Sequence, residues 1–197
     1  MADSPKVVVI AGPNGAGKST AASRILQDAL AVQEFVNADV IARGLSAFKP
    51  ESVALAAGRA MLQRLDELAA ERAEFAFETT LASRSFAPWL KRLIASGYEF
   101  HLFFVWLPNA EAAIARVQER VRSGGHYVPE ETVRRRFHSG LKNFFELYRP
   151  LAMTWQVVNN ENVVIPQVIA QGIQGLPPDV ADESLWNNIL REYGHEA

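Results

Sequence analysis

Residues 6–20 read "KVVVIAGPNGAGKST", a short β-branched run followed at once by a loop rich in glycine. The apolar run over 6–11 predicts a buried strand, and the segment from Lys18 onward predicts a helix. Residues 12–19 match the pattern G-x-x-x-x-G-K-[ST] at every fixed position. Because a strand before the loop and a helix after it are the context that this pattern requires, the stretch predicts binding of a nucleoside triphosphate.

The residue types of this loop explain the expected chemistry. Glycines allow consecutive backbone N–H groups to turn towards phosphates, and the N-terminus of the following helix adds a favourable dipole. Lys18 would reach the β- and γ-phosphates, and the Ser19 hydroxyl would be a ligand of Mg²⁺. The expected nucleotide-binding residues are Gly12, Pro13, Asn14, Gly15, Ala16, Gly17, Lys18, Ser19 and Thr20.

The composition of the chain limits its function further. Of the 197 residues, 49% are apolar and 21% are charged, and the formal net charge is −2. No globally basic field points to DNA or RNA as a partner. The sequence has no cysteine, which excludes a disulfide framework, a thiolate zinc site and a cysteine nucleophile. The apolar run near the N-terminus is too short for a signal peptide or a membrane span, so we expect a cytoplasmic protein.

Short apolar runs alternate with segments of helical periodicity along the rest of the chain. Predicted strands cover residues 34–41, 75–78, 98–107, 155–160 and 162–166. Predicted helices cover residues 18–30, 51–72, 86–97, 109–123, a segment from 129 onward, and the C-terminal tail. The alternation predicts an α/β fold of the P-loop nucleoside triphosphate hydrolase type, with a kinase-like parallel sheet and helices on both faces. We expect one domain over 1–197, with an arginine-bearing lid at about 109–136.

The candidate strands disfavour two classes of nucleotide hydrolase. The N-K-x-D motif that reads the base in GTPases is absent from the sequence. The most strongly apolar run, "FHLFFVWLPNA" at 100–110, does not end in an acidic residue, as a motor-type ATPase would require. A kinase therefore fits the loop better than oligomeric ATPase machinery does.

Two acidic motifs follow predicted strands, at the edge where open α/β sheets bind ligands. In "NAD" at 37–39, Asp39 could accept the proton of an acceptor hydroxyl, or it could cap the next helix. Beside a phosphate-binding loop we favour the catalytic role. In "FETTL", Glu78 could bind a hydroxyl or hold a Mg²⁺-bound water, and Thr79 and Thr80 offer hydroxyl groups. The alternative is a strand end that runs into a helix cap.

Phosphoryl transfer benefits from a cation over the γ-phosphate, and the predicted lid is rich in arginine. In its first helix, Arg120 lies at the flank of the apolar stripe and could reach into a cleft. In its second helix, Arg135 is expected to be solvated, and Arg134 or Arg136 to point towards the nucleotide. Each arginine could instead be a solvated surface charge. His126, between the two helices, could contact phosphate or substrate, or serve in capping or packing.

Taken in order, "GPNGAGKST", "NAD", "FETTL" and "ERVRSGGHYVPEETVRRRF" resemble the zeta toxin family, most closely its short, single-domain bacterial members. The resemblance covers roughly residues 7–160. It implies a P-loop kinase that phosphorylates UDP-N-acetylglucosamine, or a related UDP-amino sugar, with ATP and Mg²⁺ as cofactors. It also implies an antitoxin as a possible protein partner.

The resemblance extends to individual residues. It makes Asp39 the base at the sugar hydroxyl, brings Glu78 and Thr80 to the sugar nucleotide, and makes Arg120 the first arginine at the transferred phosphate. Toxins of the family characteristically have a second arginine shortly before a Thr-Pro pair. Here His126 stands at the nearest equivalent position, so that role falls to His126 or to an arginine of the next helix.

We therefore predict a kinase that moves the γ-phosphate of ATP to a hydroxyl of a small molecule, with a UDP-amino sugar as the expected acceptor. Three alternatives remain: a kinase of another small metabolite, a kinase of nucleic-acid ends, and a nucleotide-binding regulatory module without transfer activity. The acidic balance disfavours nucleic acid. The predicted catalytic residues are Lys18, Asp39 and Arg120, and the predicted substrate contacts are Glu78, Thr79, Thr80, His126 and Arg136.

Overall fold

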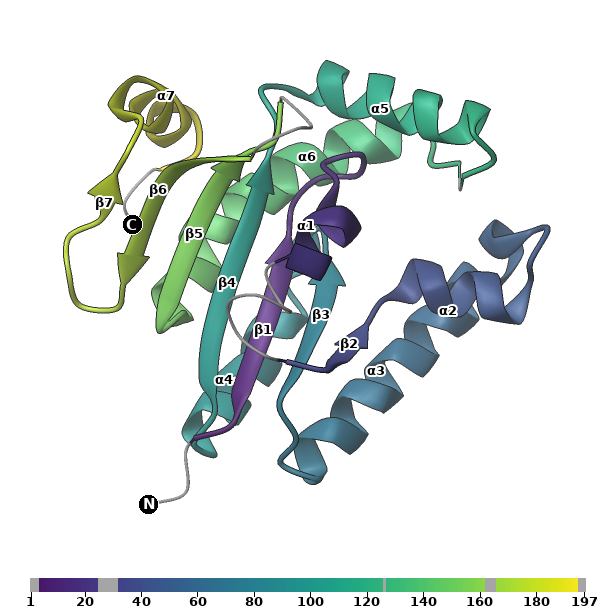
Figure 1. Ribbon diagram of the computed structural model, residues 1–197, viewed down its shortest axis with the longest axis horizontal. Helices are drawn as coiled ribbons and strands as arrows, with labels where there is room; N and C mark the ends of the chain where they lie inside the picture. The colour runs from purple at the N-terminus through teal and green to yellow at the C-terminus, as the bar shows by residue number, and fades with distance from the viewer. Residues whose placement is uncertain (1–3, 25–31, 126, 162–165, 195–197) are drawn as a thin grey trace.

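A computed structural model describes residues 4–24, 32–125, 127–161 and 166–194 and contains a seven-stranded sheet with the order β2-β3-β1-β4-β5-β6-β7. The strands are β1 (Lys6–Ala11), β2 (Glu34–Val36), β3 (Phe75–Thr79), β4 (Glu99–Trp106), β5 (Thr154–Asn159), β6 (Gln167–Ile173) and β7 (Asp179–Val180). The helices are α1 (Lys18–Arg24), α2 (Ala38–Leu45), α3 (Ala54–Ala70), α4 (Phe86–Ala95), α5 (Ala110–Arg122), α6 (Glu130–Asn143) and α7 (Glu183–Tyr193). In Figure 1, α4 and α6 lie behind the sheet and α1 stands in front of it.

The sheet is parallel from β2 to β5 and antiparallel from β5 to β7. The predicted kinase-like P-loop α/β fold, with helices on both faces of a mostly parallel sheet, is confirmed. The antiparallel β6 was not predicted. Of the strand predicted at 162–166, residues 162–165 lie outside the described residues.

The central strand β1 explains why the phosphate-binding loop has a rigid support. Its residues Val7, Val8, Val9 and Ile10 are fully buried, as expected for a strand covered on both faces. β1 pairs with β3 on one side and with β4 on the other, and Ile10 lies opposite Glu78. The carboxyl ends of β1 and β3 therefore meet at one edge, directly below the loop.

The segment after β2 differs from the prediction. β2 ends at Val36, and the chain turns at once into α2, so Asp39 lies in the first helical turn and not at a strand end. The reason is Asn37, whose side-chain oxygen accepts hydrogen bonds from the backbone N–H of Asp39 at 2.8 Å and of Val40 at 3.3 Å. Asn37 is thus the N-cap of α2. The alternative in which Asp39 caps the helix was wrong.

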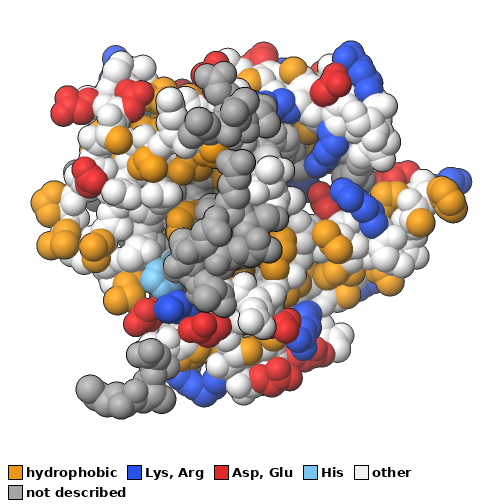
Figure 2. Space-filling model, viewed as in Figure 1, with side chains coloured by type: hydrophobic (Ala, Val, Ile, Leu, Met, Phe, Trp, Pro, Cys, Tyr) orange, Lys and Arg blue, Asp and Glu red, His pale blue; other side chains and the backbone are white. Residues whose placement is uncertain are grey.

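The helices α2 and α3 form an arm that carries several exposed apolar side chains. They are Val40, Leu45, Phe48, Leu55 and Leu62. Figure 2 shows apolar side chains on this arm, and basic and acidic side chains facing one another between the arm and α5.

Among the helices of the described ranges, none combines the length and apolar character that crossing a bilayer requires.

Candidate active site

One cavity of about 520 Å³, called the central cavity below, opens at the carboxyl edge of β1 and β3. It brings together most of the side chains that the sequence predicted: Asn14, Lys18, Asp39, Glu78, Thr79, Thr80, Arg120 and Arg136. It also contains residues that the sequence analysis did not select, among them Asn37, Leu55, Arg59, Leu62, Ser83, Ser85 and Phe86. His126 lies outside the described residues. Six elements, α1, α2, α3, β3, α5 and α6, thus supply charged side chains to one cavity.

The phosphate-binding loop has the backbone geometry that its motif requires. Gly15 and Gly17 have φ angles of 79° and 83°, in the left-handed region that side chains other than glycine rarely adopt. The Lys18 ammonium donates a hydrogen bond to the Pro13 carbonyl oxygen at 3.0 Å, and Lys18 is only 7% exposed. The lysine is therefore folded back across its own loop, where phosphates would lie.

Glu78, at the end of β3, is the charge partner of the loop. Its Oε1 lies 3.6 Å from Lys18 Nζ, and its Oε2 accepts hydrogen bonds from Ser19 Oγ at 2.6 Å and from Asn37 Nδ2 at 2.7 Å. Burial lowers the pKa of Lys18, and the nearby carboxylates of Glu78 and Asp39 oppose that shift. The two carboxylates therefore help to keep the buried lysine protonated.

The Ser19–Glu78 pair has a donor set that fits Mg²⁺. This ion prefers oxygen ligands, keeps several waters, and binds through one or two carboxylates together with nucleotide phosphates. The Ser19 hydroxyl and the Glu78 carboxylate are such oxygens, 2.6 Å apart at the start of α1. The residues present would thus hold Mg²⁺ beside the phosphates, with Glu78 on the metal side of the cavity.

Asp39 faces the same cavity from the first turn of α2. It is partly buried, and its charge is felt by two cations across the cavity, Lys18 and Arg136. Because Asn37 caps α2, the first turn of the helix fixes the position of Asp39. The Asp39 carboxylate still has access to the cavity. Such a group can accept a proton from a hydroxyl bound between it and the loop.

Two arginines of the predicted lid reach the central cavity, Arg120 from α5 and Arg136 from α6. Arg136 Nη1 lies 3.5 Å from Asn14 Oδ1, and burial lowers the pKa of its guanidinium. Arg134 forms an ion pair with Glu111 instead and is exposed. Arg135 is exposed, as the helix face predicted. Of the two flanking arginines of α6, Arg136 is therefore the one that lines the central cavity.

The loop after β3 forms a wall of the cavity. The hydroxyl oxygens of Thr79 and Thr80 accept hydrogen bonds from the backbone N–H groups two residues further on, at 3.2 and 3.4 Å. Leu81 has a φ of 55°, which is rare for a residue with a side chain, and buried Asn143 donates to its carbonyl oxygen at 2.7 Å. The wall is thus fixed from β3 and from the end of α6.

A second hollow of about 210 Å³ lies against the other side of the phosphate-binding loop. Its lining includes Gly15, Gly17, Thr20, Arg116, Glu119 and Asn160. Asn160 is buried, and its amide donates to the Ala16 carbonyl oxygen at 2.7 Å, which ties the loop to the end of β5. The phosphate-binding loop thus contributes residues to two separate hollows.

The family follows from comparison with known proteins. Residues 7–146 match the model of a family described as an AAA domain. The chain belongs to this AAA-domain family. An uncharacterized protein of Haemophilus influenzae is 32% identical to this AAA-domain chain over 132 residues, which are 67% of the chain and 92% of that protein.

Solved structures show the same fold at lower identity. The AvrRxo1-ORF1:AvrRxo1-ORF2 crystal structure with sulfate ions contains a chain that is 17% identical, with a TM-score of 0.75, and the superposition covers 94% of this AAA-domain chain. Only 63% of that chain is covered, so the protein spans less than two thirds of its length. A chain of the PezAT chromosomal toxin–antitoxin system of Streptococcus pneumoniae is 13% identical, with a TM-score of 0.65 and coverages of 100% and 81%. At these identities the likeness concerns the fold alone.

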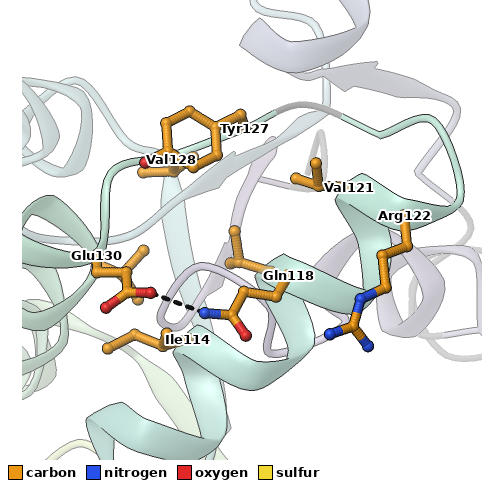
Figure 3. Close-up of a pocket in the computed structure, with 9 residues that line it drawn as sticks. Ile114, Gln118, Val121, Arg122, Tyr127, Val128 and Glu130 are labelled. Atoms are coloured by element: carbon orange, nitrogen blue, oxygen red, sulfur yellow. Dashed lines mark hydrogen bonds between the residues drawn. The ribbon is translucent and has the colours of Figure 1, made fainter.

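The helices α5 and α6 of the AAA-domain chain enclose a third, mainly apolar hollow of about 220 Å³. In Figure 3, Ile114 and Val121 of α5 lie opposite Tyr127, Val128 and Glu130. The Gln118 amide donates to Glu130 Oε1 at 2.7 Å and so bridges the two helices. None of the predicted site residues that the structure describes lines this hollow. Its walls join α5 to α6.

The end of α5 fixes Arg120 through Gly125. The Gly125 N–H donates to the Arg120 carbonyl oxygen at 2.8 Å. A Cβ at residue 125 would lie 2.4 Å from Arg120 Cγ and 2.8 Å from the Arg120 carbonyl oxygen, both too close for a real contact. Only glycine fits beside the stem of this arginine.

Gly125→Ala is therefore expected to lower turnover about 10-fold by displacing the Arg120 guanidinium from the cavity. The measurement is kcat with MgATP and a saturating acceptor. Gly124→Ala is the matched control, because Gly124 has a φ of 82° and no atom within 4 Å of an added Cβ. The control should lose about 1 kcal/mol of stability but keep kcat within about twofold. Equal kcat for both variants would refute a role for Gly125 in placing Arg120.

Proposed function

We propose that this chain transfers the γ-phosphate of ATP to a hydroxyl group of a small molecule bound in the central cavity. The observation that carries the proposal is the convergence on one cavity of the loop lysine Lys18, the carboxylate of Asp39, and the guanidinium groups of Arg120 and Arg136. A cation, a base and further cations around a phosphate-binding loop are the parts that phosphoryl transfer uses.

The proposed mechanism assigns each group one task. The loop and Lys18 hold the phosphates of ATP, and Ser19 and Glu78 would hold Mg²⁺, which would supply neutralising positive charge there. The oxygen of the acceptor hydroxyl attacks the γ-phosphorus in line with the leaving ADP. As it does so, Asp39 receives the proton of that hydroxyl. Arg120 and Arg136 stabilise the negative charge on the transferred group. The rate enhancement then comes mainly from positioning and fixed charge.

We further propose a UDP-amino sugar, such as UDP-N-acetylglucosamine, as the acceptor. The cavity volume of about 520 Å³ lies within the range of small-molecule sites, of order 300–1,000 Å³. Its lining supports an acceptor with both polar and apolar surfaces: hydroxyl groups of Thr79, Thr80, Ser83 and Ser85 and apolar groups of Leu55, Leu62 and Phe86. The four ordered motifs that resemble zeta toxins favour the same substrate, and an antitoxin-type protein is the partner we propose to seek.

The test is ADP formation by the purified protein with MgATP across a panel of UDP-sugars, other hydroxylated metabolites and nucleic-acid 5′ ends, with products identified by mass spectrometry. We expect a phosphorylated UDP-amino sugar. Turnover on another metabolite alone would keep the kinase and refute this acceptor class. Turnover on nucleic-acid ends alone would refute the small-molecule acceptor. Binding of ATP without any acceptor-dependent turnover would refute the kinase in favour of a regulatory module.

A further inference from the structure

Asn37 makes hydrogen bonds at the central cavity beyond those that a helix N-cap needs. The residue joins β2 to α2 and is only 5% exposed. Its Oδ1 accepts from the backbone N–H of Asp39 and Val40, and its Nδ2 donates to Glu78 Oε2 at 2.7 Å and lies 3.5 Å from Ser19 Oγ. Both ends of one buried amide are thus engaged, one with the helix that carries the base and one with the metal side.

Capping alone does not explain an asparagine at this position. An N-cap needs only an acceptor, so serine, threonine or aspartate would cap α2 about as well. An aspartate here would place a second carboxylate at about the position of Nδ2, 2.7 Å from Glu78 Oε2, where like charges repel. Asparagine supplies an acceptor and a donor on one short, planar group. The donor is the part that the cap does not use.

We propose that Asn37 is a positioning residue that couples the metal side of the site to the catalytic base. The inference rests on the proposed function, because it gives Glu78 and Asp39 their roles in phosphoryl transfer. In this structure Ser19 Oγ and Asn37 Nδ2 both donate hydrogen bonds to the same carboxylate oxygen of Glu78, Oε2. When Mg²⁺ and nucleotide engage the Ser19 hydroxyl, the hydrogen bond from Asn37 holds Glu78 in place. The same side chain anchors the first turn of α2, and with it Asp39.

The variant Asn37→Ser separates the two roles, since serine keeps the cap acceptor but cannot reach Glu78 as a donor. Its matched control is Asn109→Ser. Asn109 is the N-cap of α5 and accepts from the backbone N–H of Ala112 at 2.8 Å, but it does not line the central cavity. Because serine caps a helix about as well as asparagine does, neither change should lose much stability through its cap.

We expect Asn37→Ser to lower kcat by about 10- to 100-fold, as losses of groups that orient metal ligands do, with KM for the acceptor within about threefold. It should also raise about 10-fold the Mg²⁺ concentration needed for half-maximal binding of a fluorescent ATP analogue. Asn109→Ser should change neither quantity more than about twofold. Equal Mg²⁺ dependence and equal kcat in the two variants would reduce Asn37 to a cap and overturn the proposal.

The analogue titration needs no turnover, so it keeps the two hypotheses apart. A wild-type protein that binds the analogue in a Mg²⁺-dependent way but phosphorylates nothing would refute the proposed function. The shift caused by Asn37→Ser would still decide whether Asn37 acts on the metal side. If that variant does not fold, amide hydrogen exchange on the wild type replaces it. Slower exchange at Asp39 and Val40 on addition of Mg²⁺ and analogue supports the coupling, and unchanged exchange overturns it.

Discussion

Asp39→Asn is expected to lower kcat by about 10²- to 10⁴-fold, the usual contribution of a general base. Asparagine has nearly the same shape as aspartate and can keep its place in the first turn of α2, where its backbone N–H still donates to Asn37. It cannot take up a proton from the acceptor. The affinity for ATP should change by less than about threefold, because Asp39 lies across the cavity from the loop and not in it.

The measurement pairs single-turnover kinetics with a titration of the ATP analogue. Asp182→Asn is the control with the same chemical change. Asp182 caps α7 through the backbone N–H of Leu185 at 2.9 Å and does not line the central cavity, so kcat should stay within about twofold. If Asp39→Asn kept more than about a third of the wild-type kcat, Asp39 would not be the base. A large loss of analogue affinity would instead point to the charge of Asp39 acting on Lys18.

Much of this site could be predicted because the phosphate-binding loop fixes its own surroundings. A buried strand, a glycine loop and a helix place Lys18 and Ser19 with little dependence on the rest of the fold. Parallel strands end at one edge of a sheet, so Glu78, at the end of the strand predicted at 75–78, was expected to lie near them. Periodicity alone placed Arg120 and Arg136 at the flanks of their helices.

What the sequence did not reveal depends on contacts between distant segments. Periodicity placed Arg134 and Arg136 at equivalent flanks, and the choice between them comes from the ion pair of Arg134 with Glu111. In "NAD" at 37–39, the pattern indicated Asp39 as the base or as the helix cap, although the cap is Asn37. An asparagine directly before a helical pattern was a usable signal for that cap, but its second hydrogen bond to Glu78 was not readable from local sequence.

The antiparallel edge of the sheet was also hidden. β6 has few buried residues and includes Gly172, because it pairs with β5 on one side and only with the two-residue β7 on the other. Its apolar signal is therefore weaker than that of β1 or β4. A strand beside a sheet edge, such as β6, is specified by pairing with its neighbours more than by its own pattern.

Lys18→Met is expected to abolish transfer, with a loss of at least about 10³-fold in kcat, because the γ-phosphate loses the cation that we propose the loop supplies. The change also acts on the fold. Lys18 and Glu78 are a buried pair with side chains 7% and 12% exposed, so removal of the lysine leaves Glu78 charged against only two neutral donors. We expect a loss of about 1–3 kcal/mol in the free energy of unfolding, measured by urea denaturation.

A double variant distinguishes the two effects. Lys18→Met combined with Glu78→Gln removes both charges and keeps the side-chain oxygen that Ser19 and Asn37 bond, so most of the lost stability should return. Turnover should not return, because the cation is still missing. Lys6→Met is the control: Lys6, at the start of β1, pairs at 4.0 Å with Glu74, which directly precedes β3. Their side chains are 35% and 40% exposed, so this variant should lose less than about 1 kcal/mol. A double variant that regained turnover together with stability would mean that Lys18 serves the fold and not the phosphates, and the proposed mechanism would lose its central cation.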